Sequence, residues 1–452
     1  MDKEKIMNMT TGNPIKLILA FAMPLLIGNI FQQLYNMVDT IIVGRYLGVN
    51  ALAAVGATGS INFLVLGFII GLTQGLSILI AQYYGAQDYK SIRKSITMSI
   101  YLYGIVGAVI TIVSVVFSKE LLMLLNTPED IIIQADAYIR VIFWGIFVII
   151  LFNLLSGILR ALGDSKTPLY SLLISSVINI ILDVLFIVLF KSGVAGAAYA
   201  TVIAQLVSSA FCFYKILKID VIKIYREDWS FDKNFFTKSF KLGLPVALMN
   251  SVTAVGVMVL QFAVNGYGAI SVAAYSAGSK IIMILEQISV TFGSAIATYA
   301  GQNLGAGKIA RIKEGVRKTN IVLFTINVII GLGTIIFGKE LLALFVSETE
   351  IQVIDIGYEF LVITSIFLCI LGVLWIYRST LQAIGDTFVP MLSGILEFAS
   401  RIIIVMIIPK LIGFKGIPLS EVAAWTTASI LLVITYIYRI SKLNNKEEKN
   451  AY

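Results

Sequence analysis

The chain has 452 residues, of which 58% are hydrophobic and only 13% are charged, and its mean hydropathy is +0.92. Soluble domains carry about 25% charged residues, so this composition indicates an integral membrane protein with many spans. The sequence contains no histidine, which excludes histidine proton relays, histidine metal sites and histidine-based catalytic triads.

Apolar runs of membrane-crossing length recur along the whole chain. A bilayer core needs about 20 apolar residues per helix. The first run is too long for a signal peptide and lacks a small-residue cleavage site, so we expect it to remain as a span. The runs predict twelve spans, near residues 15–43, 52–82, 92–118, 134–161, 167–190, 194–217, 238–265, 270–302, 310–338, 351–381, 387–409 and 418–440.

The basic residues are distributed unevenly between the two sides of the predicted membrane. With twelve spans, 25 Lys and Arg fall in the segments that share a side with the N-terminus, and 6 fall in the opposite loops. Cytoplasmic segments of membrane proteins are enriched in these residues. The pattern predicts that both termini are cytoplasmic. It also accounts for the net charge of +8 without a nucleic-acid partner.

The sequence repeats after about 220 residues. AQYYGAQDYKSIRK at 81–94 matches GQNLGAGKIARIKE at 301–314, and RALGDSKTP at 160–168 matches LQAIGDTFVP at 381–390. Six spans separate the copies, so both halves begin on the same side, which is the parallel repeat found in some transporters. We expect an all-α protein with an N-terminal six-helix bundle (1–218), a cytoplasmic linker (219–237), a C-terminal six-helix bundle (238–440) and a cytoplasmic tail (441–452). Two facing bundles would enclose a central cleft.

The first span carries one acid, Asp39, in an otherwise lipid-compatible segment. Such a residue is costly in a membrane and is a candidate functional group. Gln32, Tyr35 and Asn36 precede it at helical spacing, so the four side chains share one stripe. Pro24 gives the same helix a place to bend. This combination predicts a cation site on a movable helix.

Two later spans add polar groups at a similar depth. Asn179 and Asp183 are one helical turn apart on the fifth span, and Thr201 and Gln205 follow on the sixth. At about 1.5 Å per residue, Asp39, Asp183 and Thr201 all lie roughly 6–11 Å from the outer ends of their spans. Two carboxylates in a low dielectric do not both ionise cheaply, so the pair could hold a proton, or Na⁺ with oxygens from Asn179 and Thr201.

The second half keeps the scaffold but loses these acids. Position 39 corresponds to Val259 or Leu260, Asn179 to Arg401, and Asp183 to Val405. A structural role common to both halves would not produce this difference. The alternative is that the first-half groups are buried polar residues bonded to neighbouring helices.

Other charges in the spans have simpler expected roles. Glu397 and Arg401 are spaced for a salt bridge within one helix. Lys280 and Glu286 could line the cleft, although six residues apart they share no face. Asp136, Arg140, Asp355 and Glu359 are near span ends and are expected at the interface. Cys212 and Cys369 lie in apolar runs, which predicts core thiols rather than a disulfide or metal site.

The motifs PLLIGN, VDTIIVGRYLG, LRALGDSKTP and NIILD, in this order, resemble the MATE (multidrug and toxic compound extrusion) family over residues 15–440. That resemblance implies a V-shaped pair of bundles that exports organic cations in exchange for H⁺ or Na⁺, with no ATP and no cofactor. The acids are most similar to the DinF branch. There, Asp39, Asn179, Asp183 and Thr201 would form the cation site, with Gln32, Tyr35 and Asn153 as neighbours and Pro24 as the bend. The second-half acids of the NorM branch are missing from the seventh span.

The resemblance also implies a bacterial plasma (inner) membrane, drugs as small-molecule partners, and a monomer. Gln205, Lys280 and Glu286 are the candidate residues of the substrate cavity. One alternative is a lipid-linked precursor flippase of the same superfamily, for which only Lys280 and Arg401 could supply a basic cleft. A membrane-embedded enzyme is a more remote alternative, because it would need a nucleophile–base pair or a metal cluster in the spans.

Overall fold

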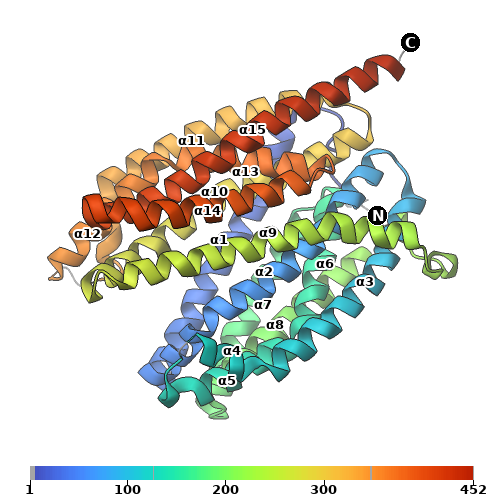
Figure 1. Cartoon of the computed structure of the whole chain (residues 1–452). Helices are drawn as coiled ribbons and strands as arrows, with labels where there is room; N and C mark the ends of the chain where they lie inside the picture. Colours follow the sequence, from blue (N-terminus) through green and yellow to red (C-terminus); the bar gives the residue numbers. More distant parts are fainter. Residues whose placement is uncertain (1–5, 126, 347–348, 451–452) are drawn as a thin grey trace. The chain divides into compact units, whose positions relative to one another are not determined.

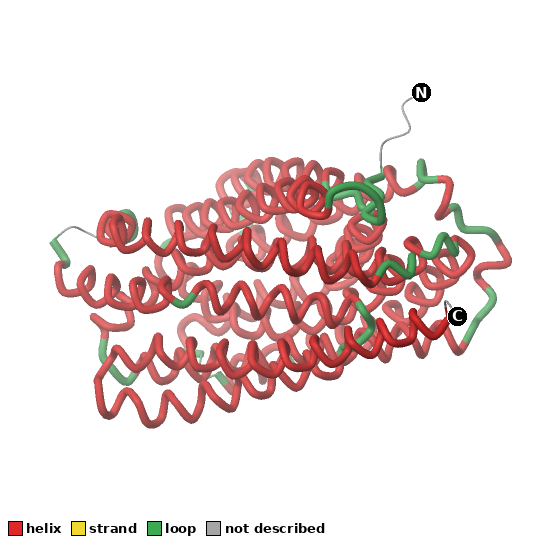
Figure 2. Tube along the Cα trace, turned by 90° about the horizontal axis from the view of Figure 1, so that it is seen from above, coloured by secondary structure: helices red, strands yellow, loops and turns green. Residues whose placement is uncertain are grey.

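The computed structural model describes residues 6–125, 127–346 and 349–450. The first five and last two residues, which belong to the predicted cytoplasmic ends, lie outside the described residues. Within the described part, the regular secondary structure is helical throughout (Figure 2). The prediction of an all-α membrane protein is therefore confirmed.

The helices follow one another with short connections (Figure 1). The first half contains α1 (Pro14–Leu47), α2 (Val49–Gly85), α3 (Tyr89–Val116), α4 (Ser118–Leu124), α5 (Glu129–Trp144), α6 (Ile146–Leu162), α7 (Lys166–Asp183), the π-helix η1 (Val184–Leu189) and α8 (Gly193–Ile216). The connecting segment carries the 3₁₀ turns η2 (Asp220–Ile222) and η3 (Arg226–Trp229). The second half contains α9 (Lys233–Asn265), α10 (Ala269–Gly305), α11 (Ile309–Ala343), α12 (Ile351–Ile366), α13 (Leu368–Ala383), α14 (Phe388–Ile412), η4 (Gly413–Lys415) and α15 (Gly416–Asn450).

These helices reproduce the predicted spans. Nine segments of the described residues are long and apolar enough to cross a membrane, or eleven when each of two bent helix pairs counts as one span. The last of the nine, residues 388–445, contains both α14 and α15, which η4 separates. Counting those two helices singly gives one helical segment for each of the twelve predicted spans.

Two of the spans are bent at equivalent places. α5 meets α6 at Gly145, and α12 meets α13 at Phe367, each with a bend of 47°. A Cβ at Gly145 would lie 2.4 Å from a methyl of Val202, so glycine lets α8 approach closely there. The second half has a bulky residue at the matching position and bends equally. The bend is therefore a property of the repeated fold and does not depend on glycine.

The left-handed turn positions repeat as well. Four residues of the second half have φ between 69° and 92°, and each has a counterpart among the six first-half residues with φ between 52° and 102°; the two without a counterpart are Gly12 and Gly193. The matching pairs, 220 or 222 residues apart, are Gly48 and Gly268, Gln87 and Gly307, Gly163 and Gly385, and Lys191 and Gly413. Only glycine adopts this conformation without strain, so backbone geometry supports the repeat where the side chains differ.

The chain forms two compact units. Of the described residues, unit 1 contains those within 6–8 and 23–247, and unit 2 contains those within 9–22 and 248–450. The first part of α1 belongs to unit 2, and the first part of α9 belongs to unit 1. Helices α1 and α9 both cross from one unit to the other, next to Pro24 and Pro245 respectively. In unit 2, the N–H of Met9 donates to Gln302 Oε1 at 3.0 Å, and Asn303 Nδ2 donates to the carbonyl of Met9 at 3.0 Å.

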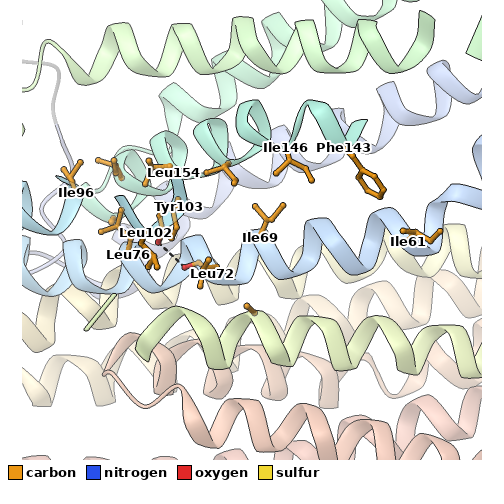
Figure 3. Packing of buried hydrophobic residues seen from close by; sticks show 14 of the residues in the cluster. Ile61, Ile69, Leu72, Leu76, Ile96, Leu102, Tyr103, Phe143, Ile146 and Leu154 are labelled. Atoms are coloured by element: carbon orange, nitrogen blue, oxygen red, sulfur yellow. Dashed lines mark hydrogen bonds between the residues drawn. The ribbon is translucent and has the colours of Figure 1, made fainter. Parts of the chain in front are cut away.

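The core of unit 1 is built around α2, α3, α5 and α6 (Figure 3). In that view Tyr103 points toward the backbone of α2, where its hydroxyl donates to the carbonyl of Leu72 at 3.1 Å. Small residues bring α2 against the first part of α9, since a Cβ at Gly75 would lie 2.4 Å from the nitrogen of Gly243. Close backbone approach at small residues is how membrane helices associate without a hydrophobic driving force.

The outer faces of the helices are apolar. In each predicted membrane-crossing window, between 22% and 50% of the residues are buried inside the protein. The remainder includes exposed large side chains, such as Ile329 and Ile336 on α11 and Ile434 on α15. In water such surfaces would promote aggregation, whereas in a bilayer they face lipid tails.

Candidate cation site

The far end of α1 is held in unit 1 by a small apolar cluster. Ile42 and Val43 are buried there against Ile187 of η1 and Ala197 of α8, and Val38 packs at the edge. These contacts fix the rotation of α1. Asp39, next to Val38, consequently faces the end of α7.

Asp39 and Asp183 meet in the interior of unit 1. Their carboxyl groups are within hydrogen-bonding reach of each other, and Asp183 is fully buried. No N–H or O–H group of the described residues donates to Asp39 Oδ1 or to either oxygen of Asp183. Asp39 is only half-buried, but its Oδ1 and both oxygens of Asp183 are buried without donors, so the two carboxyl groups repel one another when both are ionised. A proton or another cation between them removes that repulsion.

Asn179, one turn before Asp183 on α7, adds an uncharged amide oxygen to the surroundings of the carboxyl pair. Its Nδ2 donates to Thr201 Oγ1 of α8 at 3.5 Å, and its Oδ1 is buried with no donor among the described residues. Asn179 is 1% exposed, whereas Thr201 is half-buried. The sequence prediction that α7 and α8 place these two side chains together agrees with this contact.

The backbone changes type directly after Asp183. Residues 184–189 form the π-helix η1, and the N–H of Phe190 donates to the carbonyl of Leu185 at 2.9 Å, five residues back. π-helical turns are rare and occur often at functional sites. Here the wider turn begins at the acid, so the helix geometry changes at the residue that would bind the cation.

Two tyrosines complete the surroundings of the carboxyl pair. Tyr35 hydrogen-bonds with Gln32 one turn earlier on α1, and it interacts electrostatically with Asp39 and Asp183. Tyr138 of α5, which the sequence analysis did not single out, is 8% exposed and interacts with the same two acids. Tyr138 sits in an ordinary amphipathic stretch, and only its place in the fold connects it to the acids.

The equivalent place in unit 2 is an apolar cluster. Leu260 and Val405 are buried in it and Val259 packs against it; Val259 or Leu260 corresponds to Asp39, and Val405 to Asp183. The same cluster contains Phe360, which lies 222 residues after Tyr138 at the matching point of α12. Unit 2 thus packs hydrocarbon where unit 1 places two acids and a phenol, which agrees with the asymmetry found in the sequence.

Comparisons with known proteins agree with this architecture. The family model named MatE matches the chain twice, over residues 24–185 and 245–407. The two matches cover corresponding parts of the two halves and support the internal repeat. The chain belongs to the MATE family.

Individual MATE relatives cover nearly the whole chain. The chain is 31% identical to "Probable multidrug resistance protein YoeA" of Bacillus subtilis (strain 168), over 82% of this chain and 81% of that protein. It is 29% identical to "Probable multidrug resistance protein YpnP" of the same organism, over 96% and 97%. A solved structure of a multidrug resistance MATE family transporter, in an outward-facing conformation, superimposes with a TM-score of 0.89 at 25% identity, over 98% of this chain and all of that one. The protein is thus a membrane transporter and not an enzyme.

The remaining candidate residues, Asn153, Gln205, Lys280 and Glu286, lie on helices of both units. Asn153 lies on α6, where its Nδ2 donates to the carbonyl of Ile149 on its own helix at 2.8 Å. Gln205 is on α8 of unit 1, with a buried Oε1 that has no donor among the described residues. In unit 2, Lys280 lies over the ring of Phe345 at 5.9 Å, and Glu286 interacts electrostatically with Arg401 and Glu421.

The expected salt bridge within α14 is wrong. Glu397 pairs with Arg378 of α13, and Arg401 pairs with Glu421 of α15 at 2.7 Å. Spacing along one helix allowed the local pair, but each buried side chain finds a partner on a neighbouring helix instead. These two ion pairs tie α14 to both of its neighbours.

Proposed function

We propose that this transporter exports drugs and other organic cations, and that inward movement of H⁺ or Na⁺ drives the export. The proposal rests on the carboxyl pair formed by Asp39 and Asp183. It is supported by the relatives named for multidrug resistance or export, which include MepA of Staphylococcus saprophyticus. The protein would act as a monomer in a bacterial plasma membrane with both termini in the cytoplasm.

The coupling cation is held between Asp39 and Asp183 in this scheme. Because the two carboxyl groups reach one another directly, a single shared proton satisfies both, and this contact favours H⁺. Na⁺ is the alternative, with Asn179 Oδ1 and Thr201 Oγ1 as further oxygen ligands. A ligand set without nitrogen or sulfur suits either cation.

Coupling requires that two conformations of the transporter bind the cation with different affinities. Asp39 lies on α1 and Asp183 at the end of α7, so a change in the bend of α1 would separate the two carboxyl groups. Pro24 lacks the N–H that would bond the carbonyl of Ala20. Bending there breaks no hydrogen bond. Cation uptake would draw the acids together, and release of the cation would allow them to part.

Gln205 of unit 1, and Lys280 and Glu286 of unit 2, would be the substrate-binding residues of their respective units. Acidic Glu286 suits an organic cation. Glu286→Gln should raise the concentration of ethidium needed for half-maximal efflux while leaving the choice of driving ion unchanged. Unchanged ethidium dependence in that variant would show that Glu286 does not bind the substrate.

The deciding experiment is ethidium efflux from proteoliposomes under separately imposed pH and Na⁺ gradients. Wild-type protein should respond to one gradient, and Asp39→Asn and Asp183→Asn should each abolish that response. Asp355→Asn serves as the control, because this acid is exposed and bonded only to Lys339 on the surface. If neither gradient drives efflux in the wild type, drug antiport fails and lipid-linked sugars become the substrates to test. If the variants keep the response, the carboxyl pair is not the coupling site.

A further inference from the structure

A cavity lies in unit 2, and none of its lining residues belongs to the proposed cation site. It has a volume of about 560 Å³ and opens between α11, α13 and α15. Helices α11 and α15 lie side by side in Figure 1 and contact each other. The first turns of α11 and the last turns of α15 form its walls. Both belong to the side of the membrane on which the charge distribution places the cytoplasm.

The cavity carries positive charge. Lys313 and Arg317 line it from α11, and their spacing of four residues places them on one face. None of the described residues that line it is acidic. Glu314, the nearest acid in sequence, is bonded to Lys318 at 2.6 Å. Among the side chains that the structure describes, the cavity lining offers these two cations no carboxylate; outside the lining, Glu314 also interacts electrostatically with Arg317.

The opposite wall combines aromatic rings with amides. Tyr377 of α13 and Tyr436 of α15 pack edge to face, with their ring centres 5.0 Å apart and their planes at 72°. Asn320 and Asn444 supply hydrogen-bonding groups beside them. Tyrosine is enriched at the interface between lipid headgroups and acyl chains.

An apolar stripe leads away from the basic end. Ile321 and Ile437, which line the cavity, are 60% and 62% exposed. The stripe continues one turn deeper with Phe324 on α11 and Ile434 on α15, at 56% and 62% exposure. The site thus offers cations at one end and exposed apolar side chains at the other. An amphiphile with an anionic head matches both ends.

We propose that this cavity binds the phosphate headgroup of an anionic phospholipid from the cytoplasmic leaflet. Lys313 and Arg317 bind the phosphate oxygens, the amides bind the rest of the headgroup, and the acyl chains follow the apolar stripe. Organic cations, the proposed cargo, are repelled by the same two side chains. The assignment of the lipid to the cytoplasmic leaflet rests on the proposed orientation. The lipid site itself does not rest on the proposed drug export.

The test is native mass spectrometry of the full chain, delipidated in mild detergent and titrated with phosphatidylglycerol or phosphatidylcholine. We expect the wild type to bind one phosphatidylglycerol in clear preference to phosphatidylcholine. Lys313→Gln/Arg317→Gln should weaken that binding roughly ten- to thirtyfold, since each cation contributes a few-fold to tenfold. Phosphatidylcholine binding should not change.

The matched control is Lys90→Gln/Lys166→Gln, which removes the same charge from two exposed cytoplasmic-side lysines of unit 1. It should bind phosphatidylglycerol as the wild type does. An equal loss in the control would reduce the effect to general surface charge, and an unaffected site variant would overturn the proposal directly. Displacement of the lipid by millimolar inorganic phosphate would overturn it too, because the cavity would then be a site for free anions. A melting curve for each variant separates loss of binding from loss of fold.

Discussion

The ion pair between Arg378 and Glu397 allows a quantitative test of how unit 2 is held together. Both residues are 4% exposed, and the guanidinium also donates to Ser393 Oγ at 3.0 Å. Glu397→Gln leaves a buried guanidinium without its counter-charge. Breaking a buried pair in this way destabilises proteins by about 3–5 kcal/mol. We therefore expect Glu397→Gln to lower the thermal midpoint in detergent by on the order of 5 °C.

The same pair predicts a rescue. Replacing both partners by apolar residues, as in Arg378→Met/Glu397→Leu, removes the unpaired charge and should recover most of the lost stability. Glu359→Gln is the control, because its pair with Lys415 is exposed and such pairs contribute only about 0–1 kcal/mol. Equal midpoints for Glu397→Gln and Glu359→Gln would refute the reasoning, as would a double variant no more stable than the single one.

Four further outcomes are expected. Gly75→Ala places a methyl against the backbone at Gly243 and should destabilise the protein by about 1–3 kcal/mol in thermal unfolding, whereas Gly56→Ala, which meets open space, should not. Tyr138→Phe should slow gradient-driven ethidium efflux about tenfold by removing a hydroxyl beside the acids without changing the melting midpoint; normal efflux would leave the phenol outside the mechanism. Pro24→Ala should preserve or raise thermal stability but reduce efflux, and full activity would show that α1 needs no bend there. A C-terminal fluorescent-protein fusion should fluoresce in cells while an alkaline phosphatase fusion stays inactive; the reverse result would invert the proposed orientation.

The membrane spans could be predicted because the bilayer imposes them. Each helix must present an apolar surface about 30 Å long and must form the hydrogen bonds of its own backbone. Hydropathy, together with turn residues such as Gly48 and Gly268 between helices, therefore locates the helices within a few residues. The 47° bends at Gly145 and Phe367 escaped prediction. A bent helix and a straight helix of the same length and hydropathy have the same sequence pattern.

The candidate site was predictable in part for a different reason. Asp39, Asn179 and Asp183 stand out because polar groups are rare in spans, and the structure brings them together. Tyr138 and the π-helical turn after Asp183 left no comparable signal. Arg401 misled the prediction, because spacing along one helix says nothing about partners on the next.

The placement of residues 9–22 in unit 2 has a consequence for biosynthesis. Met9 is made well before its partner Gln302, which follows 293 positions later. At about 5–20 residues per second, roughly 15–60 s pass on the ribosome before that partner exists. Helix α1 therefore enters the membrane before the unit 2 partners of its leading part exist, and residues 9–22 join unit 2 only after the second half has been made. A protein truncated after the first half would keep residues 9–22 but lack the unit 2 residues, such as Gln302, that bind this segment.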